Sequence, residues 1–433
     1  MPILFSQNIS SLLRKLRPLD ALLLISLVLQ LDKSQNSLSL GLLLIWIVLR
    51  FLEPVLINRS RQDSRHAGTA YALFLGLLLF QARAIVTRSD QIGISQYLMV
   101  ALGLAVGFSL SPDAWRRLLQ WLNLATLAIS IRLLSHFRFE QDWLGEVNRE
   151  VFDEGYGNIN RLAVVLCLLT ITSWASARLS RRRFFQILGG LGAGVGYVTC
   201  LFTESRMAAI APLTAVIACW LILHGHSLLT SKARMSKPLL IAAVLIPLGT
   251  IWTFVILPDI DVGFSGDNTR MRLIRCWAGS LFSGESSLLY GTGHSREKIM
   301  ALCSDKNIGN ISAHLPGAAG HAHNAYVHLT ALHGLFGIVA ILMLILVISR
   351  GMLHHLRMAQ PSGSKDTTRS STTFSWGEAC LGFNLTILIC SLTTTIHIYN
   401  HVNQLLIGLL LSASLAPSLT ARNTRPSFPP EPL

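Results

Sequence analysis

Four histidines occur in the stretch HAHNAYVHLTALHGLFG (residues 321–337), just before apolar sequence that continues to about Ser349. Histidine can gain or lose a proton near neutral pH, because its unperturbed pKa is about 6.5. His323 is therefore a candidate general base. His328 and His333 are five residues apart and point in different directions on a helix, so we expect them to pack against neighbours.

His321 and His323 could instead bind a metal ion. The stretch has no HExxH motif, and no Asp or Glu lies between Asp305 and Asp366. A zinc hydrolase usually needs such ligands and a carboxylate base, so this pattern gives a metal site little support. We expect neither a metal nor a cofactor.

Arginines form the second chemical signal. Arg206 lies in LFTESRMAAIAPL, at the predicted start of a membrane span. It could have a functional role, or it could be an interfacial arginine whose side chain reaches toward the lipid headgroups. NTRMRLIRCW carries Arg270, Arg272 and Arg275, of which the last two share a face if the segment is helical. A solvated loop would also account for them. Guanidinium groups bind phosphate oxygens with two parallel hydrogen bonds, so these arginines are candidate ligands of an anionic substrate.

A base beside anion-binding arginines predicts transfer chemistry on a phosphate-linked lipid. The departing diphosphate would be held by arginine, and the acceptor hydroxyl would lose its proton to histidine. This chemistry requires that the histidine and the arginines face the same side of the membrane.

Composition places these residues in a membrane protein. The chain has 433 residues, of which 51% are hydrophobic and 13% charged, and its mean hydropathy is +0.51. Soluble domains carry about 25% charged residues. Apolar runs long enough to cross a bilayer recur throughout, so we predict an all-α polytopic membrane protein without a separate soluble domain or a cleavable signal. Twelve spans are predicted, centred near residues 24, 48, 77, 101, 126, 169, 193, 214, 248, 337, 386 and 410.

The net charge of +14 follows the membrane topology, and we predict no nucleic-acid partner. Every basic cluster falls on alternate loops, which predicts that both termini are cytoplasmic. The clusters are Arg14–Arg17, Arg59–Arg65, Arg116–Arg117, Arg178–Arg183, Lys232–Lys237, Arg350–Arg369 and Arg422–Arg425.

The expected organisation is one integral membrane domain over residues 1–420, followed by a disordered cytoplasmic tail at 421–433. Two long loops, 136–158 and 258–324, are predicted to face outward. Cys276 and Cys303 share the second loop and could form a disulfide there. The other five cysteines lie in or beside apolar spans, where core packing is predicted: Cys167, Cys200, Cys219, Cys380 and Cys390.

Four stretches together resemble the O-antigen ligase and O-antigen polymerase superfamily of bacterial membrane glycosyltransferases. GNINRLAVVLCLL (157–169) resembles the opening of a middle span, with Asn160 at the usual Asn, and TESRMAAIAP (203–212) resembles the Ser-Arg motif. RMRLIRCWAGSLFSGESSLLYGTG (270–293) resembles the Arg-plus-Trp helix that leads into a Gly-x-Gly turn, and the opening histidine stretch resembles the His-Asn motif, followed by Gly334.

The resemblance implies metal-independent, inverting glycan transfer from an undecaprenyl-diphosphate-linked donor to a saccharide or lipid acceptor in the bacterial cytoplasmic membrane. It makes His323 the base and lets Arg206 and Arg272 hold the diphosphate. The substrate-binding residues it implies are Arg270, Arg275, Asn324, His321 and Asn160. Gly337 stands where the ligase branch tends to have Thr, so ligase and polymerase both remain open.

Two other classes compete with this interpretation. GFSG at residues 263–266 resembles the nucleophile string of an intramembrane serine protease, but a polar run follows it. A transporter of an anionic solute is the stronger alternative, and it would predict paired charges at mid-span and broken helices.

Overall fold

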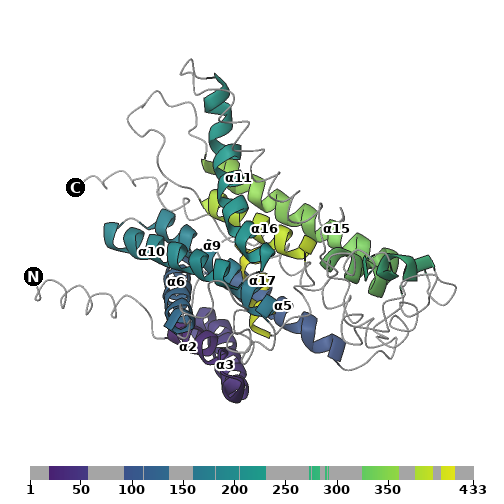
Figure 1. The fold of residues 1–433 in the computed structure, drawn as a ribbon, viewed down its shortest axis with the longest axis horizontal. Helices are drawn as coiled ribbons and strands as arrows, with labels where there is room; N and C mark the ends of the chain where they lie inside the picture. Colours follow the sequence, from purple (N-terminus) through teal and green to yellow (C-terminus); the bar gives the residue numbers. More distant parts are fainter. Residues whose placement is uncertain are drawn as a thin grey trace, which may run out of the picture.

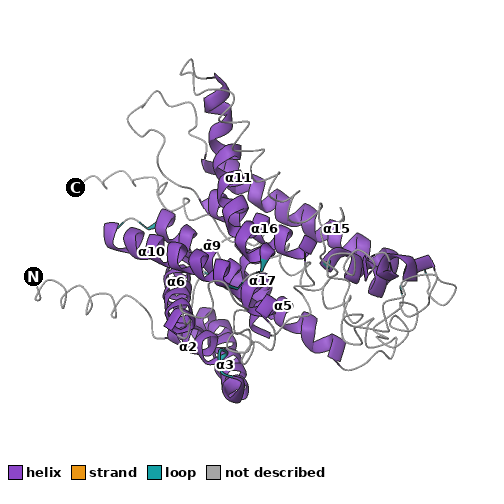
Figure 2. Ribbon diagram, in the orientation of Figure 1, coloured by secondary structure: helices purple, strands orange, loops and turns teal. Residues whose placement is uncertain are grey.

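The structure is a computed structural model that describes residues 19–56, 92–110, 112–135, 159–180, 182–203, 205–230, 324–359, 376–393 and 401–414, with residues 273–274, 276–282, 288–289 and 291. In these ranges the regular elements are helices, and no strand is present (Figures 1 and 2). The long helices are α2 (Leu19–Leu29), α3 (Asn36–Leu56), α5 (Ile92–Ser109), α6 (Pro112–Ser135), α9 (Ile159–Leu179), α10 (Arg183–Phe202), α11 (Arg206–Thr230), α15 (Ala325–Ala359), α16 (Trp376–Thr393) and α17 (His401–Ala413).

The all-α membrane class predicted from the sequence agrees with these helices. Each long helix contains one predicted span centre, and the centres near residues 77 and 248 lie outside the described residues. Within the described ranges, four helical segments are long and apolar enough to cross a membrane: Lys33–Phe51, Asp113–Ser135, Asn160–Leu179 and Arg183–Phe202. The length and composition of these helices indicate a helical protein that is embedded in a membrane. Twelve crossings and the large loop stay predictions.

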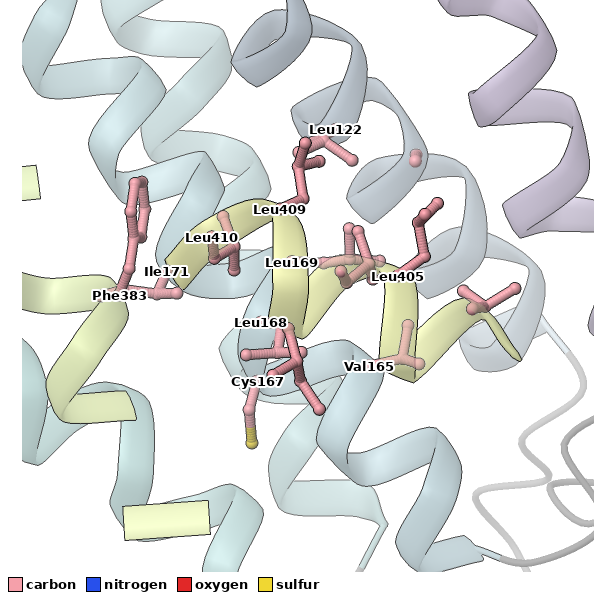
Figure 3. Packing of buried hydrophobic residues seen from close by; sticks show 14 of the residues in the cluster. Leu122, Val165, Cys167, Leu168, Leu169, Ile171, Phe383, Leu405, Leu409 and Leu410 are labelled. Carbon is pink, nitrogen blue, oxygen red and sulfur yellow. The ribbon is translucent and has the colours of Figure 1, made fainter. Parts of the chain in front are cut away.

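Helix α9 occupies the centre of the bundle. Residues 162–169 are eight consecutive positions with 0% exposure, so this helix is covered on every side there. Its neighbours are α6, α10, α11, α16 and α17. Figure 3 shows how Cys167 and Leu168 of α9 lie among residues of α17 and α16, including Leu405 and Phe383. An apolar sequence without a polar stripe is what such a central position requires.

Small residues let the helices approach this centre closely. Gly192 and Gly196 of α10 face α6 and α9. A Cβ on Gly192 would lie 3.2 Å from Ser173 Oγ, and a Cβ on Gly196 would lie 2.7 Å from Thr170 Oγ1. Gly408 of α17 packs so closely on α5 that a methyl group would overlap the carbonyl of Val100. Helix association in membranes depends on such close packing, because lipid offers no hydrophobic driving force between helices.

A fully buried ion pair joins α2 to α3. Arg50 donates to Asp20 Oδ1, and both side chains have 0% exposure. Trp46 Nε1 donates to the same oxygen at 3.1 Å. Asp20 lies in the first turn of α2, where the helix dipole favours an anion. Neither residue was singled out from the sequence, although Arg50 interrupts an apolar run and Asp20 lies at the start of one.

Asp20→Asn should strongly destabilise the protein, because it removes the carboxylate that is ion-paired with the buried Arg50. Breaking one side of a buried pair costs about 3–5 kcal/mol. The matched control is Asp113→Asn, which removes the partly exposed partner of Arg116, 3.6 Å away, and should cost less than about 1 kcal/mol. Thermal unfolding of the detergent-purified protein measures both, and equal melting temperatures for the two variants would contradict this account.

Candidate functional site

Helix α11 begins at Arg206, and sulfur contacts fix its first turn. Met207 Sδ lies 3.2 Å from Cys390 Sγ of α16 and 3.9 Å from Cys167 Sγ of α9. Cys167 Sγ also lies 3.7 Å from the carbonyl oxygen of Ala208. The structure describes the backbone of Arg206 and not its side chain. The backbone of this predicted site residue is therefore anchored to the core of the bundle.

Asn324 begins α15 and ties it to α16. Its side-chain Oδ1 accepts hydrogen bonds from the backbone N–H groups of Tyr326 at 3.0 Å and Val327 at 3.1 Å. This is an N-cap, which satisfies donors that the first helical turn leaves without partners. Its Nδ2 donates to the carbonyl of Leu392, 3.0 Å away, near the end of α16. Asn324 thus holds the amino end of α15 against the carboxyl end of α16.

These contacts bring Arg206 and Asn324 to the same end of the bundle. Their anchor points on α16, Cys390 and Leu392, are two residues apart, which is about 3 Å along a helix axis. His323, the predicted base, directly precedes Asn324 in the sequence. The sequence alone could not show this meeting, because residues 206, 324 and 390 are far apart along the chain.

The segment after the predicted loop arginines packs on α15. Residues 276–279 are helical and continue into η4 (Ser280–Phe282). The Trp277 ring is buried and lies 4.3 Å from the His328 ring, centroid to centroid, at an interplanar angle of 32°. Ala331 and Leu332 complete this small cluster. His328 and His333 are both buried, in agreement with the prediction that they pack.

Cysteine usage also follows the sequence prediction where the structure describes it. Cys276 is disulfide-bonded. Its predicted partner, Cys303, lies outside the described residues. The five cysteines assigned to core packing are buried and form no disulfide. A disulfide at Cys276 is consistent with an oxidising compartment on that side of the membrane.

Two glycines hold the loop against a kink in α15. Gly334 has φ 59° and ψ −146°, which interrupts the helix, and Gly291 has φ 71°. A Cβ on Gly334 would lie 2.6 Å from the Leu288 carbonyl oxygen, and one on Gly291 would lie 2.6 Å from the Ala331 carbonyl oxygen. Leu335 N–H donates to that Leu288 oxygen at 3.0 Å. The first glycine of the Gly-x-Gly turn, Gly291, and the glycine that follows His333, Gly334, therefore make backbone-to-backbone contact.

The remaining predicted site residues are placed as follows. Asn160 is the second residue of α9, seven positions before Cys167, and thus about 10 Å along the helix from the Met207 contact. The carbonyl of its neighbour Arg161 accepts a hydrogen bond from Asn403 Nδ2 at 3.1 Å, which joins α9 to the start of α17. Five predicted residues lie outside the described ones: His321, His323, Arg270, Arg272 and Arg275.

Among the described residues, no group of three or more His, Cys, Asp or Glu side chains could hold a metal ion. Since His321 and His323 are not among them, metal independence stays a prediction. Sequence reasoning missed the contacts of Met207, Cys390 and Leu392, because nothing in an apolar run marks which residues will meet.

No family model matches the chain, and no curated protein matches it. The function therefore has to be inferred from the residues and their geometry.

Gly334→Ala should detach the 288–291 turn from α15. The new Cβ would overlap the Leu288 oxygen, and a backbone at φ 59° and ψ −146° costs about 1–3 kcal/mol for a residue other than glycine. Gly190→Ala is the control, since its Cβ would meet nothing within 4 Å. Hydrogen–deuterium exchange over residues 276–291 should rise in Gly334→Ala alone. Unchanged exchange in that variant would show that the glycine contact does not hold the turn.

Asn324→Ala should destabilise the start of α15 by about 1 kcal/mol for the lost N-cap, with a further loss from the Leu392 contact. Asn324→Ser keeps a capping oxygen but cannot reach Leu392. It should therefore recover the stability that the N-cap contributes, and not the part that the Leu392 hydrogen bond contributes. Thermal unfolding of the two variants measures the difference. Equal losses in Ala and Ser would mean that the cap contributes nothing.

Proposed function

We propose that this protein transfers or polymerises glycan from an undecaprenyl-diphosphate-linked donor onto a saccharide or lipid-linked acceptor. The reaction takes place at the outer face of the cytoplasmic membrane, in the manner of the O-antigen ligases and polymerases that the sequence resembles. Its substrates are the lipid-linked glycan and the acceptor, and its other partners are the surrounding membrane lipids.

One observation carries this proposal. The residue after Arg206 and the residue after His323 are anchored two positions apart on the last turns of α16. The chemistry needs an anion-binding arginine and a base on one side of the membrane, and this geometry supports that requirement at the level of the backbone. The Trp277 segment, which follows the loop arginines, packs on the same part of α15.

The proposed reaction is a single displacement. His323 takes the proton of the acceptor hydroxyl, and that oxygen attacks the anomeric carbon of the donor as the bond to the diphosphate breaks. Inversion at that carbon follows from the single attack. Arg206 and Arg272 bind the departing diphosphate and stabilise its charge. The lipid diphosphate already supplies the leaving group, so the proposal uses no nucleotide, metal or cofactor.

Asn324 is better explained as a positioning residue than as a substrate ligand. Its amide is engaged with the first turn of α15 and with Leu392. These bonds fix the backbone next to His323. Arg270, Arg275, His321 and Asn160 keep the substrate-binding roles that the resemblance implies.

His323→Ala should abolish glycan transfer while leaving the protein inserted, because general-base catalysis contributes about 10²–10⁴-fold to rate. Lipid-linked glycan should accumulate and the surface polymer should disappear. Arg206→Gln should give the same phenotype. His354→Ala and Arg350→Gln, both toward the other end of α15, are the matched controls and should leave transfer unchanged.

Expression and membrane insertion of each variant are checked in parallel by blotting of membrane fractions. A well-inserted His323→Ala variant with normal surface glycan would refute the base assignment. The histidine stretch would then be structural, and transport of an anionic solute would become the favoured function.

A further inference from the structure

A cavity of about 360 Å³ opens at the other end of the bundle, where α9 ends and α6 and α10 begin. Three arginines line it: Arg116 and Arg117 from α6, and Arg182, the residue before α10. Sites for small ligands have volumes of roughly 300–1,000 Å³, so this cavity can take a compact polar group. It is called the arginine pocket below.

The arginine pocket has an excess of positive charge. Asp113 is the single acid among the lining residues that the structure describes, and its Oδ1 lies 3.6 Å from Arg116 Nη1. Both side chains of that pair are more than a third exposed, and such pairs contribute little. The guanidinium groups of Arg117 and Arg182 line the same space in addition to the pair of Arg116 with Asp113. Guanidinium forks match the oxygens of a phosphate group.

The start of α10 adds to this preference for an anion. Arg182 is its N-cap, with extended backbone geometry and no side-chain capping hydrogen bond. The first N–H groups of the helix carry partial positive charge at this end. These N–H groups add to the positive potential of the three arginines, so the arginine pocket combines fixed positive charge with hydrogen-bond donors at the helix end.

The apolar residues that line the arginine pocket favour a lipid ligand over a soluble anion. Leu119, Leu179 and Phe185 also line the pocket, and the adjacent Phe184 is 47% exposed. These side chains can contact the glycerol and upper acyl region of a lipid while the arginines hold its phosphate. The charge pattern assigns this end to the cytoplasm, where basic pockets between membrane helices bind anionic headgroups.

We propose that the arginine pocket binds the phosphate group of an anionic phospholipid headgroup. Binding there joins α6, α9 and α10 at the end opposite Arg206 and Asn324. The bound lipid stabilises the folded bundle by mass action, since it binds the native state and not the unfolded chain. This role does not depend on the proposed glycan transfer.

Native mass spectrometry of the full-length protein in detergent tests the proposal. The probes are phosphatidylglycerol and phosphatidylcholine with identical acyl chains. The wild type should bind phosphatidylglycerol at least about tenfold more tightly, which corresponds to about 1.4 kcal/mol. Arg117→Gln/Arg182→Gln should lose that preference. The control Arg178→Gln/Arg183→Gln removes two charges from the same end, from positions that do not line the pocket, and should keep it.

Each other outcome overturns part or all of the proposal. Equal losses in the two double variants would mean nonspecific attraction to a basic surface. No preference in the wild type would exclude the site. Inorganic phosphate that binds or competes as well as phosphatidylglycerol would show that the pocket takes a soluble anion and not a lipid. Should the double variant misfold, Arg182→Gln alone, at an exposed helix end, gives the same comparison against Arg183→Gln.

Discussion

Burial of α9 on every side is the constraint on which the rest of the bundle depends. Eight consecutive residues without exposure require neighbours in all directions, and α6, α10, α11, α16 and α17 supply them. Close approach is possible because glycines and small polar residues line the contacts, as at Gly192 and Gly196. Any helix that carries a functional residue is therefore positioned through its contact with α9 or with a neighbour of α9.

The carboxyl end of α16 turns that packing into a candidate site. It receives the start of α11 through the contact of Met207 with Cys390, and the start of α15 through the contact of Asn324 with Leu392. The first contact is between soft sulfur atoms inside the core, and the second is a directed hydrogen bond at its edge. Together they hold two helix starts beside one helix end.

Two groups of charged side chains in the described part of the bundle lie where their charge can be compensated. Asp20 and Arg50 are buried together, and Trp46 adds a third donor to the cluster. The arginines of the arginine pocket lie at a helix end, where water or an anionic headgroup can reach them. Both arrangements follow from the same physical rule, that an uncompensated charge within the bilayer is expensive.

The sequence by itself determined the helical membrane class, the span centres that the described helices contain, and the identity of the groups able to do chemistry. Hydrophobic run length and residue type decide these properties, and both are local. Tertiary structure alone decided that Met207 meets Cys390, that Asn324 joins α15 to α16, and that Gly291 contacts Gly334. It also decided the pairing of Asp20 with Arg50 and the convergence of Arg116, Arg117 and Arg182. Each of these contacts joins different helices or loops, and an apolar run does not specify which face it presents to which neighbour.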